Sequence, residues 1–435
     1  MVGNGGVILV RKFLSFLGTT NYEECTYEFG NLEKSQYHTK FVQEALLNLI
    51  CKDWTKEDTA VIFLTKQAEK ENWYNQDDEN RRLKTILGNL TINVKGVSIP
   101  EGKTEEEIWQ IFNIVNNMID DGDEIIFDIT HSFRSIPMLA LVVLNYAKIV
   151  KNATILGIYY GEYDRNEAKV RPMHIIDLTP LNEILEWAQA VNVFLKYGIS
   201  GPFRDISIRQ LKPHLGSEQW ARDTRQFIES LNNLTMCLYT CRGKSLSGLG
   251  TDKKSISAAA EAVNINISKI KNIDEDIQLK PLIPLMDKIE KKLEIFHKND
   301  NLNIGLAAVK WSIEHNLIQQ AYTAFDETIV TYVCLEFGLD SSNNVDREEI
   351  AKKALRLREK NIREDEWDVK REYWDQVKNI YYKLDSELVS ISNSVSAKRN
   401  DVNHFGFRDD ASKYPDLINN IKECFNRFLD YINKD

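Results

Sequence analysis

The first half of this 435-residue chain alternates short apolar runs with stretches of helical periodicity, and this alternation limits the possible folds more than any other feature. Apolar runs typical of strands lie at residues 13–17, 26–29, 60–64, 92–97, 125–127 and 153–160. Helical periodicity lies between them at 41–50, 105–119 and 138–150. Strands that alternate with helices in this way predict a mostly parallel sheet with helices on both faces.

Two of the predicted strands are followed by polar turns. The first is Gly18-Thr19-Thr20-Asn21-Tyr22, and the second runs from Asp128 through Thr130, His131 and Arg134 to Pro137. Ligands of open α/β sheets bind at the carboxyl ends of strands and against helix N-termini. Hydroxyls, an imidazole, a guanidinium and free backbone N–H groups suit an anion or a nucleotide. The alternative explanation of the second turn is a strand–helix connection whose Thr and Ser merely cap the helix.

Several function classes are excluded or disfavoured. Neither turn has the glycine spacing of a dinucleotide fold or a P-loop, so ordinary NAD or ATP binding is not predicted. The net charge of −10 argues against a constitutive, tight nucleic-acid binder, although not against a local basic site. The six scattered cysteines lack zinc-site spacing and are expected to be buried free thiols in a reducing cytosol. We see no leader peptide or bilayer-spanning run and expect a cytoplasmic protein that does not associate with membranes.

The composition pattern changes beyond the first half. Residues 1–195 form the predicted α/β domain, and residues 196–280 read as a helical connector with a Gly/Ser-rich stretch at 243–257. Residues 281–435 show helical stripes alone and predict an all-helical bundle. One stripe is expected to run unbroken from 306 to 337, and another from 380 to 395.

The chemical candidate of the helical half is Arg399-Asn400-Asp401-Val402-Asn403-His404. Arg-x-x-x-x-His is a weak pattern, and Arg209 and His214 match it too, but Pro213 beside that histidine makes the earlier match accidental. Five helical steps separate two side chains by roughly 140°, so a straight helix would not aim both at one phosphate. A helix break at the motif, or a site shared by two protomers, would solve this. A surface arginine and a capping histidine remain the plain alternative.

The second turn, Asp-x-Thr-His-x-Phe-Arg-x-x-Pro, with the Gly18 turn before it and Gly157-Ile158-Tyr159-Tyr160-Gly161 after it, resembles the CRISPR-associated Csx family. The similarity continues through Ile176-Asp177-Leu178-Thr179 and Trp187-Ala188, and covers about residues 11–195. This resemblance implies a CARF domain, a Rossmann-like homodimeric sensor of cyclic oligoadenylate. It implies that both turns line the ligand pocket, through Gly18, Thr19, Thr20, Asn21, Thr130, His131, Ser132, Phe133 and Arg134.

Taken together, the two halves resemble the CARF–HEPN ribonucleases of type III CRISPR defence. The resemblance implies a metal-independent endoribonuclease that needs no cofactor, cuts single-stranded RNA and is activated by a cyclic oligoadenylate, with cyclic tetra-adenylate the first choice. Arg399 and His404 would be the catalytic pair and Asn400 a helper, in a homodimer or a higher oligomer. Polar residues of the long helical run, Asn316, Gln319 and Glu327, are weaker candidates for orienting the pair.

Two other hypotheses stay open at this point. The chain could be a ligand-sensing regulator whose helical part binds nucleic acid without cutting it, although no basic recognition helix is visible. Alternatively, the N-terminal pocket could itself cleave the cyclic activator, with His131 and Ser132 as the residues to test. The sequence does not decide the ring size of the activator, the RNA base preference or the proton-transfer role of His404.

Overall fold

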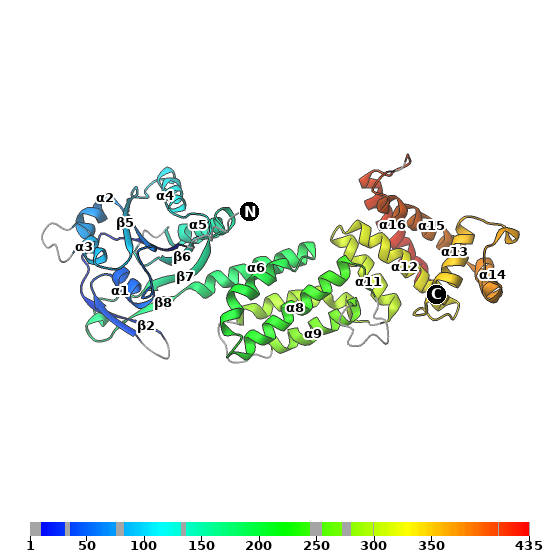
Figure 1. Ribbon diagram of the computed structural model, residues 1–435, viewed down its shortest axis with the longest axis horizontal. Helices are drawn as coiled ribbons and strands as arrows, with labels where there is room; N and C mark the ends of the chain where they lie inside the picture. Colours follow the sequence, from blue (N-terminus) through cyan, green and yellow to red (C-terminus); the bar gives the residue numbers. More distant parts are fainter. Residues whose placement is uncertain are drawn as a thin grey trace, which may run out of the picture. The chain divides into compact units, whose positions relative to one another are not determined.

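The computed structural model describes residues 10–30, 35–74, 82–131, 136–243, 255–271, 280–298, 300–407 and 409–434. The chain divides into two compact units, 1–183 and 184–435, with the division inside helix α6 (Thr179–Tyr197). The first unit is α/β and the second is helical, as the sequence predicts (Figure 1). The three-part division at 195 and 280 stays a prediction.

An eight-stranded sheet in the order β3-β2-β8-β7-β6-β1-β4-β5 forms the middle of the first unit. Its strands are β1 (Arg11–Phe16), β2 (Cys25–Phe29), β3 (Ser35–Thr39), β4 (Thr59–Leu64), β5 (Asn93–Ser98), β6 (Glu124–Asp128), β7 (Thr154–Gly161) and β8 (Met173–Asp177). The β2–β3 and β7–β8 pairs are antiparallel and the other pairs are parallel, so the expectation of a mostly parallel sheet is confirmed.

Helices cover both faces of this sheet. Neighbouring residues of the central strands point to opposite faces, so both are buried. Phe13 packs with α1 (Val42–Leu49), α2 (Lys66–Ala68) and α3 (Leu83–Gly88), whereas Leu14 packs with α4 (Glu105–Asn117) and α5 (Ile136–Val150). The continuous apolar run Ala60 to Leu64 alternates between the same two cores. The first unit therefore has the Rossmann-like layering predicted from the sequence.

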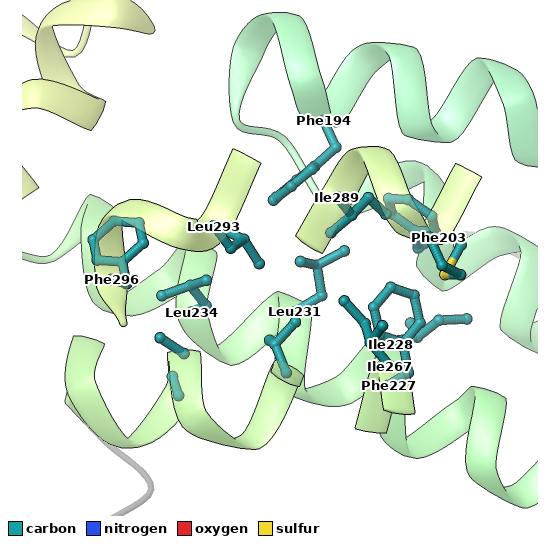
Figure 2. Close-up of a cluster of buried hydrophobic side chains, with 14 of the residues drawn as sticks. Phe194, Phe203, Phe227, Ile228, Leu231, Leu234, Ile267, Ile289, Leu293 and Phe296 are labelled. Atoms are coloured by element: carbon teal, nitrogen blue, oxygen red, sulfur yellow. The ribbon is translucent and has the colours of Figure 1, made fainter. Parts of the chain in front are cut away.

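The first part of the helical unit shares one hydrophobic core. It contains α6, α7 (Gly201–Ile206), α8 (Gln219–Tyr239), α9 (Ile256–Lys271), α10 (Ile283–Leu293) and α11 (Asn301–Glu314). Figure 2 shows Phe203, Phe227 and Ile289 of this core, which come from α7, α8 and α10. Trp187 and Trp311 belong to the same cluster. The middle of the chain is thus a packed helical body, and most of the Gly/Ser-rich stretch lies outside the described residues.

A second core joins the remaining helices, α12 (Ile318–Glu336), α13 (Lys352–Glu359), α14 (Trp374–Lys383), α15 (Ser386–Asn403) and α16 (Tyr414–Ile432). The helical runs predicted at 306–337 and 380–395 are each divided into two helices. Asn316, with a φ of 56°, separates α11 from α12, and Asp385 caps the start of α15 just after α14 ends. Apolar periodicity predicted both runs correctly as helical but carries no signal for these short breaks.

All six cysteines are free, and all but Cys241 are buried, as the sequence predicts. No helix in the described part of the chain combines the length and the apolar character needed to cross a bilayer.

Candidate functional site

The two polar turns meet at the carboxyl edge of the sheet. Strands β1 and β6 are parallel neighbours, with Ser15 paired to Asp128, so the turns that follow them emerge side by side. Between them lies a cavity of about 270 Å³. Its lining is mainly hydroxyl and ring side chains, from Phe16, Leu17, Gly18, Thr19, Thr20, Tyr22, Thr65, Ile99, Thr130 and His131.

Asp128 fixes the shape of the second turn from inside the protein. Its fully buried carboxylate accepts hydrogen bonds from the Ser15 hydroxyl at 2.7 Å, the Thr130 amide at 2.9 Å and the Thr130 hydroxyl at 2.5 Å. Burial raises the pKa of this carboxyl. The Thr130 hydroxyl oxygen also accepts from the Gly161 amide at 2.7 Å. Asp128 therefore holds the turn, while Thr130 ties the turn to β7.

Asn72 fixes the first turn in a similar way. The buried amide of Asn72 donates to the carbonyl oxygens of Gly18 at 2.9 Å and Thr20 at 3.0 Å. A Cβ at Gly18 would lie 2.3 Å from the Tyr22 hydroxyl oxygen, so this turn needs glycine for the close approach of that ring. Asn72 follows β4 and lies far from both motifs in the sequence, which is why sequence reasoning missed it.

His131 presents an uncharged imidazole beside the cavity. Its ring packs against Tyr22 with the ring centroids 4.5 Å apart. Its Nε2 is shielded from solvent and has no hydrogen-bond partner among the described residues. Burial lowers the pKa of His131 to about 4. At neutral pH the ring therefore offers hydrogen bonds without a positive charge.

The predicted pocket residues fall into three groups. Gly18, Thr19, Thr20, Thr130 and His131 line the cavity, and Asn21 is exposed beside it without lining it. Ser132, Phe133 and Arg134 lie outside the described residues. Tyr22, Thr65 and Ile99 are lining residues that sequence reasoning did not select. Tyr22 stood inside the quoted first turn, and the other two follow β4 and β5, whose ends carry no distinctive motif.

In the helical unit, Arg399 is held by an acid from another helix. Its Nη1 lies 2.7 Å from Asp326 Oδ2, and Asp326, on α12, is only 7% exposed. Ser396, one turn before Arg399 on α15, donates to the other oxygen of Asp326 at 3.0 Å. The Arg399 Nε is buried and has no protein partner within the described residues. Asp326 therefore orients the guanidinium, and the Arg399 side chain remains 27% exposed.

Helix α15 ends at the last residue of the Arg399–His404 motif. Helix α15 runs to Asn403, and His404 is its C-cap, with its amide bonded to the Asn400 carbonyl oxygen at 3.0 Å. Phe405 and Gly406 follow with φ values of 57° and 73°, which stop the helix. His404 and Asn400 are exposed. No break in the helix therefore separates Arg399 from His404.

The three weaker candidates for orienting this pair differ. Gln319 donates to the Asn403 side chain at 3.3 Å, next to His404. Glu327 instead pairs with Arg347 at 2.8 Å and Lys352 at 3.0 Å, and Asn316 forms the break between two helices. The residue that contacts Arg399 and orients it is instead Asp326. Its only signal in the sequence is an acid beside Phe325 in an otherwise apolar buried stripe.

The fold and the pocket define the first unit as a Rossmann-like domain with a candidate ligand site at the carboxyl edge of its sheet. Residues 12–170 match the family model of the CARF domain of the CRISPR system endoribonuclease Csx1. Residues 12–170 are therefore similar to a CARF domain. The predicted recognition of a CARF-containing, CRISPR-associated protein is confirmed.

Two further similarities complete the comparison. CRISPR-associated protein MJ1674 of Methanocaldococcus jannaschii is 28% identical over 266 residues, which are 60% of this chain. The match spans only 37% of that relative's length. The solved structure of Enterococcus italicus Csm6 bound to cyclic hexa-2'-fluoro-hexa-dAMP aligns over 97% of this chain and 94% of its own. Its TM-score of 0.45 and identity of 11% are too low to support a functional argument.

Proposed function

We propose that this protein is a metal-independent endoribonuclease of type III CRISPR antiviral defence, activated by a cyclic oligoadenylate. The observation that carries the proposal is the cavity between the β1 and β6 turns of a CARF-like domain, lined in part by hydroxyls and by His131. The Arg399–His404 pair, with Arg399 oriented by a buried acid, supplies a candidate reaction centre in the same chain. By its resemblance to CARF–HEPN ribonucleases, the helical unit would be the HEPN part.

The size of the cavity supports a ligand shared by two copies of the chain. Its volume of about 270 Å³ is just below the range of roughly 300–1,000 Å³ that drug-sized ligands occupy. A ring of four adenylates is larger than such ligands. Two cavities related by a two-fold axis would each hold part of the ring, with hydroxyls and backbone amides facing its phosphates. We therefore propose cyclic tetra-adenylate as the activator and a homodimer as its receptor.

An exposed apolar face on α5 supports the same dimer. Met138, Val142 and Ile149 are 73%, 53% and 82% exposed, and Leu141 and Tyr146 are exposed on the same helix. Monomeric soluble proteins seldom expose such contiguous apolar surfaces. Helix α5 begins where the turn after β6 ends, so a second copy packed on this face would bring a second pocket close to the first.

Arg399 and His404 of the helical unit suit RNA cleavage by the substrate's own 2'-hydroxyl. In this reaction the 2'-oxygen attacks the adjacent phosphorus, the bond to the 5'-oxygen breaks, and the products are a 2',3'-cyclic phosphate and a 5'-hydroxyl. His404 would exchange a proton with the attacking or the leaving oxygen. Arg399 would hold the phosphate and offset its developing charge. Asn400 would be a helper, and a second protomer would complete the site.

Activation then requires that the ligand favour one of two arrangements of the catalytic pairs. A complete switch from one percent to ninety-nine percent active needs about 5.5 kcal/mol of differential binding. Cleavage of the activator by its own pocket is not favoured, because a histidine with a pKa of about 4 is a weak base at neutral pH.

The test is to incubate the full-length protein with labelled single-stranded RNA and EDTA, with and without cyclic tetra-adenylate. We expect cleavage that depends on the activator and is lost in His404→Ala and Arg399→Ala. Cleavage that survives His404→Ala would overturn the catalytic assignment, and cleavage unaffected by the activator would overturn its control. Linear adenylates that form in the His404→Ala variant would reveal a second activity in the CARF pocket.

A further inference from the structure

Two phenylalanine side chains project into solvent immediately after His404. Phe405 is 86% exposed and Phe407 is 87% exposed, which makes them the most exposed aromatic side chains of the described residues. Their rings are nearly parallel, with an interplanar angle of 24° and centroids 6.2 Å apart. Neither ring belongs to any hydrophobic core of the described residues, so core packing does not explain them.

The backbone of this turn has an unfavourable conformation at Phe405. Phe405 has a φ of 57°, a left-handed conformation that bulky residues rarely adopt and that glycine adopts freely. Gly406, at 73°, continues the same turn. The amides of Phe405 and Phe407 bond to the carbonyl oxygens of Val402 and His404, both at 3.1 Å, so the turn is fixed to the end of α15. A strained, exposed aromatic is typical of a functional position.

We propose that Phe405 and Phe407 form a stacking platform for bases of single-stranded RNA next to the cleavage site. The inference rests on the proposed ribonuclease function and adds the part of the substrate that the site holds. Exposed aromatic rings bind unpaired bases by stacking, in a manner that tolerates any base. RNA recognition commonly uses unstacked bases in this way.

The charge of the protein favours this occupant. With a net charge of −10, the chain as a whole has no excess of positive charge to attract a nucleic-acid backbone. Stacking supplies affinity without positive charge. An acidic protein depends on this source of affinity more than a basic ribonuclease would. Two rings offer far less area than the roughly 800 Å² per partner of a stable protein interface, so they do not by themselves account for a second protein.

The position of the platform also fits the reaction. Phe405 follows His404 directly, and the Phe407 amide is bonded to the His404 carbonyl oxygen. A base stacked on either ring would hold its ribose and phosphate near the imidazole. This would reduce the freedom of a flexible substrate at the site where the 2'-oxygen must align with the phosphorus. Such positioning tolerates any sequence and therefore predicts little base preference from these two residues.

The test measures binding of a fluorescein-labelled, mixed-sequence single-stranded RNA to full-length His404→Ala, which leaves the RNA intact. Adding Phe405→Ala and Phe407→Ala together should weaken binding by about 25-fold or more, because each stacked base contributes roughly 5- to 150-fold. Tyr382→Ala removes another exposed aromatic of the helical unit, 61% exposed on α14, and should leave RNA affinity unchanged. Phe405→Trp and Phe407→Trp should retain binding.

The melting temperature separates this role from a structural one. Phe405→Gly removes the ring and relieves the left-handed strain, so it should lose RNA affinity while its melting temperature stays equal or rises. RNA affinity unchanged in the double alanine variant overturns the platform, whether or not the wild type cleaves RNA. A double variant whose sedimentation shows a smaller oligomer also overturns it and assigns the rings to a contact between copies. Lost RNA affinity in a protein that never cleaves RNA would support the platform and reject the ribonuclease.

Discussion

At the scale of single residues, the proposed reaction centre depends most on the ion pair between Asp326 and Arg399. Asp326→Asn would remove the charge that holds Arg399 at 2.7 Å. We expect RNA cleavage to fall by about 10- to 100-fold, since small misplacements of a catalytic group have effects of this size. The free energy of unfolding should fall by about 1–3 kcal/mol, because the ion pair is largely shielded from solvent.

Glu327→Gln is the matched control for Asp326→Asn. It lies one residue along the same helix and loses ion pairs with Arg347 and Lys352 instead. It should lower stability comparably and leave cleavage near the wild-type rate. Equal losses of activity in the two variants would mean that Asp326 acts only through the stability of α12.

The Gly18 turn gives a second test at the residue scale. Gly18→Ala places a methyl group 2.3 Å from the Tyr22 hydroxyl oxygen and should displace that ring from the pocket. We expect the affinity for cyclic tetra-adenylate, measured by calorimetry, to fall at least tenfold. Tyr22→Phe in the same protein removes the clashing oxygen and should restore part of it. Gly88→Ala, where a Cβ meets nothing within 4 Å, should have no effect on binding.

His131 predicts how stability depends on pH. Its folded pKa of about 4 lies below the ordinary value of 6.5, so the unfolded chain binds more protons between these two values. Stability due to His131 is therefore complete above about pH 6.5 and is lost as the pH falls towards 4. The urea midpoint should fall from pH 7 to pH 5 less steeply in His131→Asn than in the wild type. Identical slopes would show that His131 does not contribute.

At the scale of elements, the sequence predicted best where periodicity was strong. Buried central strands such as β4, TAVIFL, and amphipathic helices such as α4 were predicted within a few residues. The edge strand β3, SQYHT, was missed because its one large apolar residue gives no pattern, and its strand conformation depends on pairing with β2. Asp326 was missed for a related reason, since its partner lies 73 residues away and no local pattern encodes that contact.

The apolar face of α5 yields a prediction at the same scale. Val142→Glu with Ile149→Glu puts charges on residues that are 53% and 82% exposed, so the monomer should keep its stability. If this face joins two protomers, the variant should sediment as a monomer and lose activator binding. Trp109→Glu, on the neighbouring helix α4 and 58% exposed, tests whether the interface extends further. A double variant that remains a dimer would place the interface elsewhere.

At the scale of the whole molecule, the two candidate sites lie in separate units joined within α6. In the proposed function, the first unit would recognise the ligand at its own strand ends, and the second would perform the phosphate chemistry with residues of its own helices. A ligand-gated nuclease would explain why one chain contains both candidate sites. In such a protein, binding of the ligand at the first site changes the population of active arrangements at the second.

The most direct measurement is the single-turnover rate of RNA cleavage by the full-length protein as cyclic tetra-adenylate is titrated. The account predicts a rate that is low without the activator, rises at least tenfold and saturates at one ring per two chains. The same titration of His404→Ala should show unchanged activator binding and no cleavage. A rate that does not change with activator occupancy, measured while calorimetry confirms binding, would contradict the central claim.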